Sequence, residues 1–264
     1  MKRSLLSAAL LLISLTACAQ LKQEPASAPL TPFYTADEAP HLELVLPEPP
    51  AYGSIRYQDD WAMYQWGKSI RQTERGEQAI ADAGINAEYF MQRFSPAMGV
   101  ELTPEAYPHL YRLIARAHLT EQQAGASAKR HFARVRPYQQ FAEPSAVPMA
   151  ENPTDYTSYP SGHTHASWLV GLILTAIDPA HTEQIMKVAY ELGQSRVIVG
   201  FHYQSDIEAG RYAGSITFAR LCANTEFQQM LQEAQAEMIS QVRSGQVSAS
   251  KNNPRHGDQG CGED

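Results

Sequence analysis

Apolar residues recur at helical spacing over most of this chain. Positions repeated every three or four residues lie on one face of a helix, and polar residues fill the positions between them. This spacing predicts helices over 54–83, 103–119, 121–135, 178–199, 201–221 and 224–242. The sequence shows no internal repeat and no convincing strand. The pattern therefore predicts an all-α fold, with one helical domain over residues 51–244.

One more helix is expected to be buried on all sides. It begins after the stretch 159–164, and its residues 166–174 are almost entirely apolar. Ser161 is a suitable N-cap because its hydroxyl can accept a hydrogen bond from a free N–H of the first turn. The preceding residues 139–159 contain three prolines and small polar residues, so we predict a loop that forms one wall of a site.

The start of the chain reads as an export signal. Lys2 and Arg3 precede an apolar run over 5–17, which is too short to span a bilayer and is typical of a secretory signal over residues 1–17. The sequence 15–18 resembles a bacterial lipoprotein box, with a lipid anchor at Cys18 and a periplasmic location, on the outer membrane when anchored. The alternative is ordinary cleavage after Ala19. Both alternatives export the protein.

Two further segments flank the predicted domain. Residues 18–50 are proline-rich and predict an extended segment. Partial packing on the domain is one alternative, and a disordered linker is the preferred interpretation for 20–40. Residues 245–264 are polar and rich in Gly, Ser and Asn, which predicts a flexible tail. Cys222 and Cys261 remain after export, and they could pair in an oxidising periplasm; spacing alone leaves this open.

Composition narrows the function classes. The chain has 264 residues, 44% of them hydrophobic, and a formal net charge of −7. Removal of residues 1–17 takes away Lys2 and Arg3 and makes the mature charge about −9. Nucleic-acid binding, which needs a basic face, is therefore not expected. An anionic substrate would have to be held by local positive charge.

Ser161, Gly162 and His163 could form an anion site at the start of the buried helix. A helix start offers free N–H groups and the positive end of the dipole, and glycine lets a ligand approach the backbone. His163 can carry a proton near neutral pH. Taken alone, a capped core helix with a packed histidine is the better interpretation. His165 lies on another helix face and is expected to be structural.

Lys129 and Arg136 are a second candidate pair. They are seven residues apart, which would place them on nearly the same face of a helix over 121–135. Two cations that close repel each other unless an anion lies between them, and an arginine fork suits a phosphoryl group. A solvated basic face is the alternative, and it is the expected role of Arg130 and Arg134.

Arg196, His202 and Asp206 form the third group. His202 and Asp206 would be neighbours one helical turn apart, so that the carboxylate fixes the imidazole tautomer and leaves the other nitrogen free as a nucleophile. Such pairs are also common surface interactions. In the predicted loop over 139–159, Asp155, Tyr156 and Tyr159 are possible substrate contacts, although surface or packing roles are more frequent.

The three groups follow one another in an order that resembles a known signature. Lys129 and Arg136-Pro137 fill K-x6-R-P, residues 160–163 fill P-S-G-H, and residues 195–206 fill S-R-x5-H-x3-D. This is the signature of the acid phosphatase/vanadium haloperoxidase superfamily, also called PAP2. Residues 59–64 and 73–76 resemble the N-terminal region of class A bacterial non-specific acid phosphatases. The resemblance covers most of residues 50–240.

The resemblance implies a compact helical domain of the acid phosphatase/vanadium haloperoxidase type and a role for each site residue. His202 would attack phosphorus and form a phosphohistidine, Asp206 would orient it, and His163 would protonate the leaving oxygen. Phosphate would be held by residues from all three groups. These phosphate-binding residues are Lys129, Arg136, Ser161, Gly162 and Arg196.

The expected activity is hydrolysis of small phosphate monoesters such as nucleotides, sugar phosphates and aryl phosphates. An acidic optimum follows if His163 must be protonated. The cationic site predicts no metal and no cofactor. Relatives of this kind are commonly homo-oligomers. Alternatives are a vanadium haloperoxidase, a membrane lipid phosphatase, a phosphotransferase using the same site, and a non-catalytic periplasmic anion-binding protein.

Overall fold

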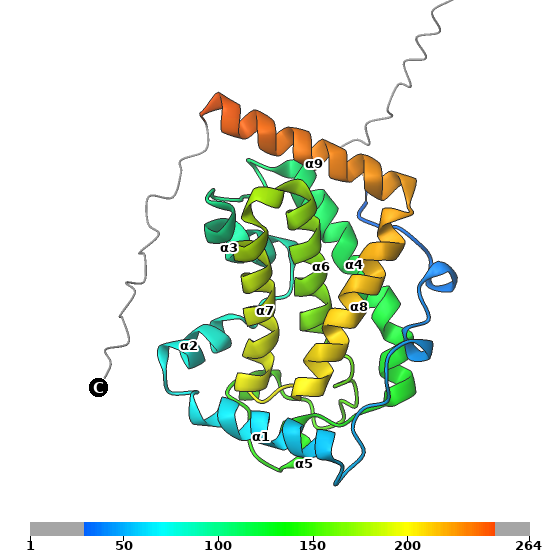
Figure 1. The fold of residues 1–264 in the computed structure, drawn as a ribbon, viewed down its shortest axis with the longest axis vertical. Helices are drawn as coiled ribbons and strands as arrows, with labels where there is room; N and C mark the ends of the chain where they lie inside the picture. Colours follow the sequence, from blue (N-terminus) through cyan, green and yellow to red (C-terminus); the bar gives the residue numbers. More distant parts are fainter. Residues whose placement is uncertain (1–28, 246–264) are drawn as a thin grey trace, which may run out of the picture.

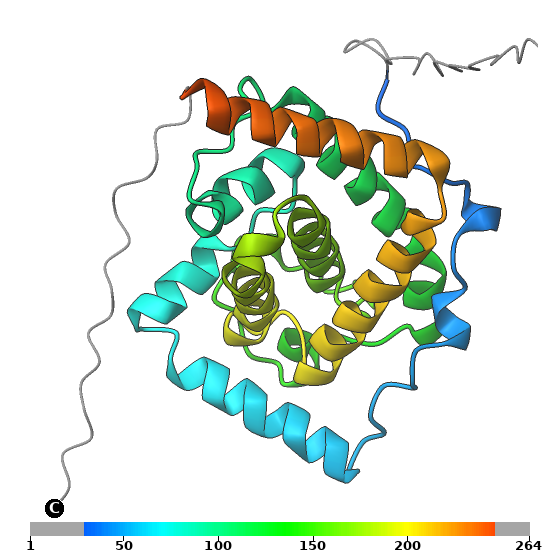
Figure 2. The same cartoon turned by 45° about the horizontal axis from the view of Figure 1, so that its top comes forward.

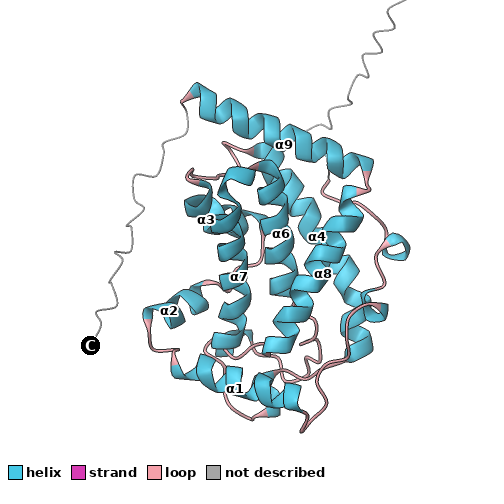
Figure 3. Ribbon diagram, viewed as in Figure 1, coloured by secondary structure: helices cyan, strands magenta, loops and turns pink. Residues whose placement is uncertain are grey.

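The computed structural model describes residues 29–245, and this part of the chain is all-α (Figure 3). No strand occurs in it, which confirms the predicted fold class. The longer helices are α1 (Ile55–Ser69), α2 (Glu74–Ala81), α3 (Ala87–Met98), α4 (Pro108–Phe132), α6 (Gly162–Ile177), α7 (Thr182–Ile198), α8 (Gln204–Cys222) and α9 (Thr225–Ser244). The short elements are α5 (Pro137–Gln140) and the 3-10 helices η1 (Ala36–Glu38), η2 (Leu42–Leu44), η3 (Pro148–Ala150) and η4 (Pro179–His181).

Helix α6 lies at the centre of the molecule (Figure 1). It packs against α7, α8 and α4, and most of its side chains are buried, as its apolar sequence predicts. Figure 2 shows α6 and α7 nearly end-on inside a ring formed by the other long helices. The start of α6, the end of α7 and the start of α8 therefore lie at the same end of the molecule.

A glycine brings α8 close to the start of α6. A Cβ atom on Gly210 would lie 2.8 Å from the Ser161 carbonyl oxygen and 2.8 Å from the Thr164 Cβ, so no larger residue fits without a shift. The Ser161 N–H also donates to the Asp206 carbonyl oxygen over 3.0 Å. These contacts fix the relative position of the two helix starts that carry site residues.

Several predicted helix boundaries differ from the observed ones. The helix predicted over 54–83 is two helices, because the chain turns at 70–73 and Thr73 caps α2 by accepting from the Gly76 N–H. The helices predicted over 103–119 and 121–135 are the single helix α4. It ends at Phe132, where Ala133 adopts a left-handed conformation with φ 43°. Helix α3 was not predicted.

The chain before His202 also differs from the prediction. Gly200 has φ 79° and ends α7, as its position in the sequence predicted. The N–H groups of Phe201 and His202 then donate back to the Arg196 carbonyl oxygen, and α8 begins only at Gln204. His202 therefore precedes the helix that contains Asp206, whereas we expected both residues on one helix.

The N-terminal segment is packed onto the helices. Phe33, Tyr34 and Leu42 are buried, and the Phe33 ring lies edge-on to Phe227 at 5.4 Å. The Phe33 N–H donates to the Thr120 hydroxyl, and Pro47 accepts from the Tyr159 hydroxyl. Over its described part, this segment is therefore not the disordered linker that proline content predicted, and packing begins before residue 51.

Other predictions concern the chain ends and the membrane. Within residues 29–245, none of the helices combines the length and apolarity needed to cross a bilayer. Cys222 is exposed at the end of α8. Its predicted partner Cys261, the anchor position Cys18 and the tail beyond residue 245 lie outside the described residues.

Candidate active site

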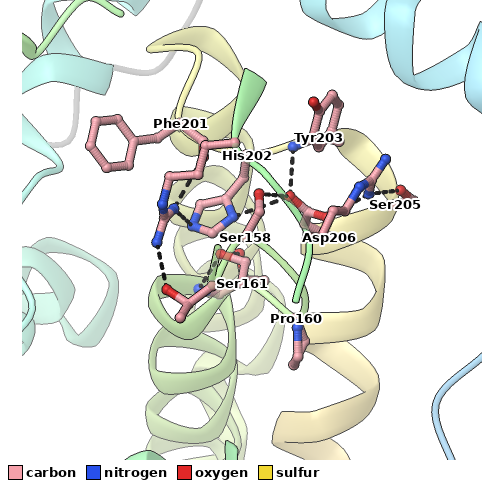
Figure 4. Close-up of polar contacts among 12 residues, drawn as sticks. Ser158, Pro160, Ser161, Phe201, His202, Tyr203, Ser205 and Asp206 are labelled. Carbon is pink, nitrogen blue, oxygen red and sulfur yellow. Dashed lines mark hydrogen bonds and ion pairs between the residues drawn. The ribbon is translucent and has the colours of Figure 1, made fainter. Parts of the chain in front are cut away.

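Site residues gather where α6 and α8 begin and α7 ends. Figure 4 shows His202 beside Ser158 and Asp206, with Ser161 below them at the start of α6. Arg196 belongs to the last turn of α7, and Arg136 reaches the same place from the segment between α4 and α5. Three segments that are far apart in the sequence thus meet at one end of the bundle.

The partners of His202 define which ring nitrogen is free. Arg136 Nη1 lies 3.0 Å from Nε2, and a guanidinium can only donate, so Nε2 is the acceptor. The proton of the neutral ring is therefore on Nδ1, which faces Asp206 Oδ2 at 3.3 Å. Burial and the charges of Arg136, Lys129 and Arg196 lower the pKa of His202 well below its usual range. The ring is thus a neutral base with its Nε2 lone pair on the cationic side.

Asp206 is fully buried and its two oxygens have different partners. Oδ2 accepts from the Ser158 hydroxyl over 2.6 Å, from the Tyr203 N–H over 2.9 Å and from His202. Oδ1 accepts from Arg134 Nη1 over 2.6 Å. With both oxygens held, the carboxylate cannot rotate away from the imidazole. The predicted His202–Asp206 contact is present, although it does not arise from one helical turn.

Arg136 is buried and held on several sides. Its Nε donates to Asp155 Oδ2 over 2.6 Å, and its Nη1 donates to the Phe201 carbonyl oxygen over 3.2 Å. Thr157 Oγ1 accepts from Nη2 over 3.3 Å. Asp155 therefore orients an arginine of the site, a role that the sequence did not indicate.

Lys129 reaches the start of α6 from the last turn of α4. Its Nζ donates to the carbonyl oxygens of Thr157 and Pro160 over 2.8 and 2.7 Å. Burial and the charge of Arg136 lower the pKa of Lys129 to about 8, so it is cationic in acid. Because α4 ends at Phe132, Lys129 and Arg136 do not share a helix face as predicted; they converge through the turn at Ala133.

Arg196 is a buried cation without an anion. Arg196 is only 2% exposed, and its side-chain nitrogens Nε and Nη1 are buried with no hydrogen-bond acceptor. Burial and the charge of Arg136 lower its pKa to about 10. The Phe201 ring centre lies 5.1 Å from the Cζ atoms of both Arg136 and Arg196. A buried unpaired guanidinium is costly, so an acceptor bound here would stabilise the protein.

Ser161 caps α6 as predicted. Its hydroxyl oxygen accepts from the Thr164 N–H over 3.3 Å and from the Thr164 hydroxyl over 3.0 Å. The Ser161 proton therefore stays available to donate. A Cβ atom on Gly162 would lie 3.6 Å from Lys129 Cε, which places the lysine side chain directly over the first turn. The helix start and the ammonium group thus present donors from neighbouring positions.

His163 lies at the same helix start, and its Nε2 is 3.1 Å from the Ala83 carbonyl oxygen. Since a carbonyl only accepts, Nε2 carries a proton and Nδ1 is the nitrogen that titrates. Burial and the charge of Arg196 lower the pKa of His163 well below its usual range, with smaller effects of His202 and Arg136. A dianion bound beside these cations would reverse much of that shift.

Arg134 corrects a prediction. It was expected on a solvated face, but its side chain is only 9% exposed and forms ion pairs with Asp60 and Asp206 at 2.8 and 2.6 Å. Asp60 comes from α1, more than seventy residues earlier in the chain. Sequence spacing gave no signal for this contact. Arg130, the other arginine assigned to a solvated face, is exposed as expected.

The remaining candidates divide clearly. Tyr159 is buried and packs edge-on against Phe132, whereas Tyr156 is exposed. His165 is interior, as predicted, with Nδ1 3.2 Å from Glu121 and Nε2 2.8 Å from the Thr217 hydroxyl. Between residues 29 and 245 we find no group of three or more His, Cys, Asp or Glu side chains placed to hold a metal ion.

Comparison with known proteins identifies relatives of this chain. The model of the PAP2 superfamily matches residues 111–230. A non-specific acid phosphatase of Providencia stuartii is 40% identical over 197 residues, which cover 73% of this chain and 79% of the relative. A non-specific acid phosphatase of Salmonella typhi is 35% identical over 214 residues, covering 80% and 86%.

Among solved structures, a transmembrane PAP2 type phosphatidylglycerolphosphate phosphatase from Bacillus subtilis matches with a TM-score of 0.46 and 20% identity, covering 67% of this chain and 87% of that one. The sequence relatives define the class. The chain belongs to the PAP2 superfamily. Within it, the chain is a member of the bacterial class A non-specific acid phosphatases and is a phosphatase enzyme. A non-catalytic binding protein is thereby set aside.

Replacement of Arg196 tests whether its unpaired charge awaits an anion. We expect Arg196→Met to unfold at a temperature equal to or above that of the wild type in phosphate-free buffer, since an unpaired buried charge is removed. Phosphate at a hundred times its Kd should stabilise the wild type by about 2.7 kcal/mol and the variant much less. Differential scanning calorimetry with and without phosphate measures both effects.

Arg220→Met, at the far end of α8, is the control for loss of one positive charge. It should keep the full stabilisation by phosphate. An Arg196→Met protein that phosphate stabilises as strongly as the wild type would show that Arg196 does not receive the anion.

Proposed function

We propose that this protein is an exported acid phosphatase that hydrolyses small phosphate monoesters through a phosphohistidine at His202. The observation that carries the proposal is the environment of His202 Nε2. Its lone pair is directed at Arg136, and Arg196 close by has two buried nitrogens without an acceptor. A phosphoryl group placed there would supply acceptors to the cations and an electrophile to the imidazole.

The phosphoryl oxygens would be held by donors from three segments. Arg136 and Arg196 offer guanidinium N–H groups, Lys129 offers its ammonium, and Ser161 and the first N–H groups of α6 complete the set. On binding, Arg136 would exchange its hydrogen bond to Nε2 for one to a phosphoryl oxygen and so release the nucleophile. Preorganised cations of this kind stabilise the charge of a phosphoryl-transfer transition state.

In the first step the Nε2 lone pair of His202 attacks phosphorus. The bond from phosphorus to the ester oxygen breaks, and its electron pair stays on that oxygen. His163 gives the oxygen a proton, so that an alcohol leaves. The His202 ring keeps its Nδ1 proton and becomes a positively charged phosphohistidine. Asp206 opposite Nδ1 would stabilise this charge.

In the second step water attacks the same phosphorus. Neutral His163 takes a proton from the water, the bond between phosphorus and Nε2 breaks, and its electron pair returns to the ring. Inorganic phosphate then leaves, and both histidines regain their initial states. An alcohol in place of water would give phosphotransfer at the same site, and vanadate could occupy it in a haloperoxidase; the relatives named as acid phosphatases favour hydrolysis.

Broad specificity follows from where the donors lie. Lys129, Arg136 and Arg196 lie close together around His202 and would all contact the phosphoryl group, which every monoester shares. Nucleotides, sugar phosphates and aryl phosphates are therefore the proposed substrates. No metal or cofactor takes part in either step. A homo-oligomer, which the sequence resemblance implies, is part of the same proposal.

Export and anchoring rest on residues 1–18 of the sequence. We expect the wild type to fractionate with membranes after metabolic labelling with a radioactive fatty acid. Cys18→Ala should lose the label and be recovered in the periplasm, because the thiol that would carry the lipid is gone. Unlabelled wild-type protein in the periplasm would support ordinary cleavage, and protein retained in the cytoplasm would contradict export.

The phosphohistidine can be trapped. With a radiolabelled phosphate ester, in chelator, denaturation in alkaline detergent within the first turnover should give labelled wild-type protein whose label is base-stable and is lost in acid. His202→Ala should give no label and lose activity by several orders of magnitude, because the nucleophile is absent. His163→Ala should accumulate more label with p-nitrophenyl phosphate, whose leaving group needs no proton, since the hydrolysis step loses its base.

His165→Ala serves as the control, since this buried histidine faces Glu121 and Thr217 instead of the anion position. It should label like the wild type per folded molecule. Equal turnover by His202→Ala and the wild type would show that another group attacks phosphorus. Loss of wild-type activity in chelator would contradict the metal-free mechanism.

The pH profile should separate the free enzyme from the complex. In the empty site the pKa of His163 is lowered, so its protonated form is lost as pH rises through that low pKa, and kcat/KM should fall already in acid. Bound phosphate raises the pKa, so the descending limb of kcat should lie at higher pH. His202 stays neutral in acid because its pKa is lowered too.

Measurement of kcat and kcat/KM with an alkyl phosphate from pH 4 to 9 gives both limbs. In His163→Asn, the descending limbs should disappear together with most of the activity toward the alkyl ester. A maximum of kcat/KM well above neutrality would contradict the role of His163 as the acid.

A further inference from the structure

Arg134 joins two buried carboxylates that come from different helices. Its Nη2 donates to Asp60 Oδ2 over 2.8 Å, and its Nη1 donates to Asp206 Oδ1 over 2.6 Å. The side chains of both acids are almost fully buried. The guanidinium also lies over the Tyr203 ring, with Cζ 3.8 Å from the ring centre. Arg134 is therefore fixed from three directions.

Asp60 binds the start of α8 at the same time. Its Oδ1 accepts from the Ser205 N–H over 2.8 Å, and its Oδ2 accepts from the Ser205 hydroxyl over 2.6 Å. Figure 1 shows α1 crossing the end of the bundle where α8 begins. The Asp60 carboxylate thus binds Arg134, which pairs with Asp206, and it also binds the first turn of α8, which contains Asp206.

The cluster of Asp60, Arg134 and Asp206 contains more negative than positive charges. Asp60 and Asp206 carry two negative charges and Arg134 carries one positive charge. Buried charges interact strongly because little water screens them. Without Asp60, Arg134 would neutralise Asp206 alone, and the His202 ring would face a neutral ion pair. With Asp60 present, one negative charge remains for the imidazole.

We propose that Asp60 is a positioning residue for the nucleophile, which pairs with Arg134 and so leaves the charge of Asp206 available to the phosphorylated His202 ring. This inference rests on the proposed phosphohistidine mechanism. The ring gains a positive charge when Nε2 binds phosphorus, while Nδ1 keeps its proton toward Asp206. The effect of Asp60 therefore concerns the phosphorylation step and not the binding of phosphate by Lys129 and Arg196.

The first experiment compares Asp60→Asn with Asp59→Asn in the mature protein. Asp59 is the exposed neighbour on the same helix and controls for loss of one acid. Rapid-quench kinetics with p-nitrophenyl phosphate give the burst rate constant, and the burst amplitude counts active molecules. We expect Asp60→Asn to lower the burst rate constant by about tenfold or more, as loss of a supporting partner of a site residue typically does. The Ki of inorganic phosphate should stay unchanged.

The second experiment adds Arg134→Gln and the double variant Asp60→Asn/Arg134→Gln, with Arg130→Gln as the exposed control. The double variant restores the single negative charge at Asp206. We expect it to recover part of the burst rate constant that Asp60→Asn loses, so that the two substitutions are not additive. A purely structural role predicts that the double variant is the most impaired.

Several outcomes overturn the inference. A burst rate constant in Asp60→Asn equal to that of Asp59→Asn, with only a smaller amplitude or a lower unfolding temperature, means that Asp60 merely stabilises the fold. A double variant slower than Asp60→Asn does the same. If the variants do not fold, nitrogen NMR of histidine-labelled wild type decides, since an Nε2–H tautomer of His202 excludes the proposed arrangement. A wild type without any phosphoenzyme contradicts the proposed function instead.

Discussion

The mutual repulsion of buried cations governs this site. Lys129, Arg136 and Arg196 come from three segments and lie close enough that the charge of Arg136 lowers the pKa of both others. Such a cluster is unfavourable in an empty protein, and its members would move apart if their backbones allowed it. Hydrogen bonds hold two of these side chains in place, from Lys129 to the carbonyl oxygens of Thr157 and Pro160 and from Arg136 to Asp155 and the Phe201 carbonyl oxygen. An anion bound among the three cations would relieve their repulsion.

Nearby carboxylates relieve only part of this repulsion. Asp155 forms an ion pair with Arg136. Asp82 forms no ion pair with Arg196; its carboxylate accepts from the Ser195 hydroxyl over 2.5 Å and pairs with Arg93. The charge of Asp82 raises the pKa of Arg196, but burial and Arg136 outweigh it. The acids thus fix the positions of neighbouring side chains but do not neutralise the positive charge of Arg196.

The sequence predicted which residues form the site better than it predicted how they meet. The resemblance to the superfamily signature singled out Arg136, Ser161, Arg196 and His202, and the structure places these residues at one end of the bundle. Helical spacing then gave the wrong geometry for Lys129 and Arg136, since local periodicity does not reveal the turn at Ala133. The ion pairs of Arg134 were not predicted, for a different reason. Its partners lie more than seventy residues away in both directions, and no local pattern encodes such a contact.

The same cations determine the pH range in which the site can work. Lys129, with its pKa lowered to about 8, loses its charge above that pH, so the proposed phosphate site would then have one positive charge fewer. Below that pH Lys129 is charged, while burial and the neighbouring positive charges lower the pKa of His202 and favour its neutral ring. In the proposed mechanism the neutral ring attacks phosphorus, so burial among positive charges would extend the range of acidic pH in which His202 can act.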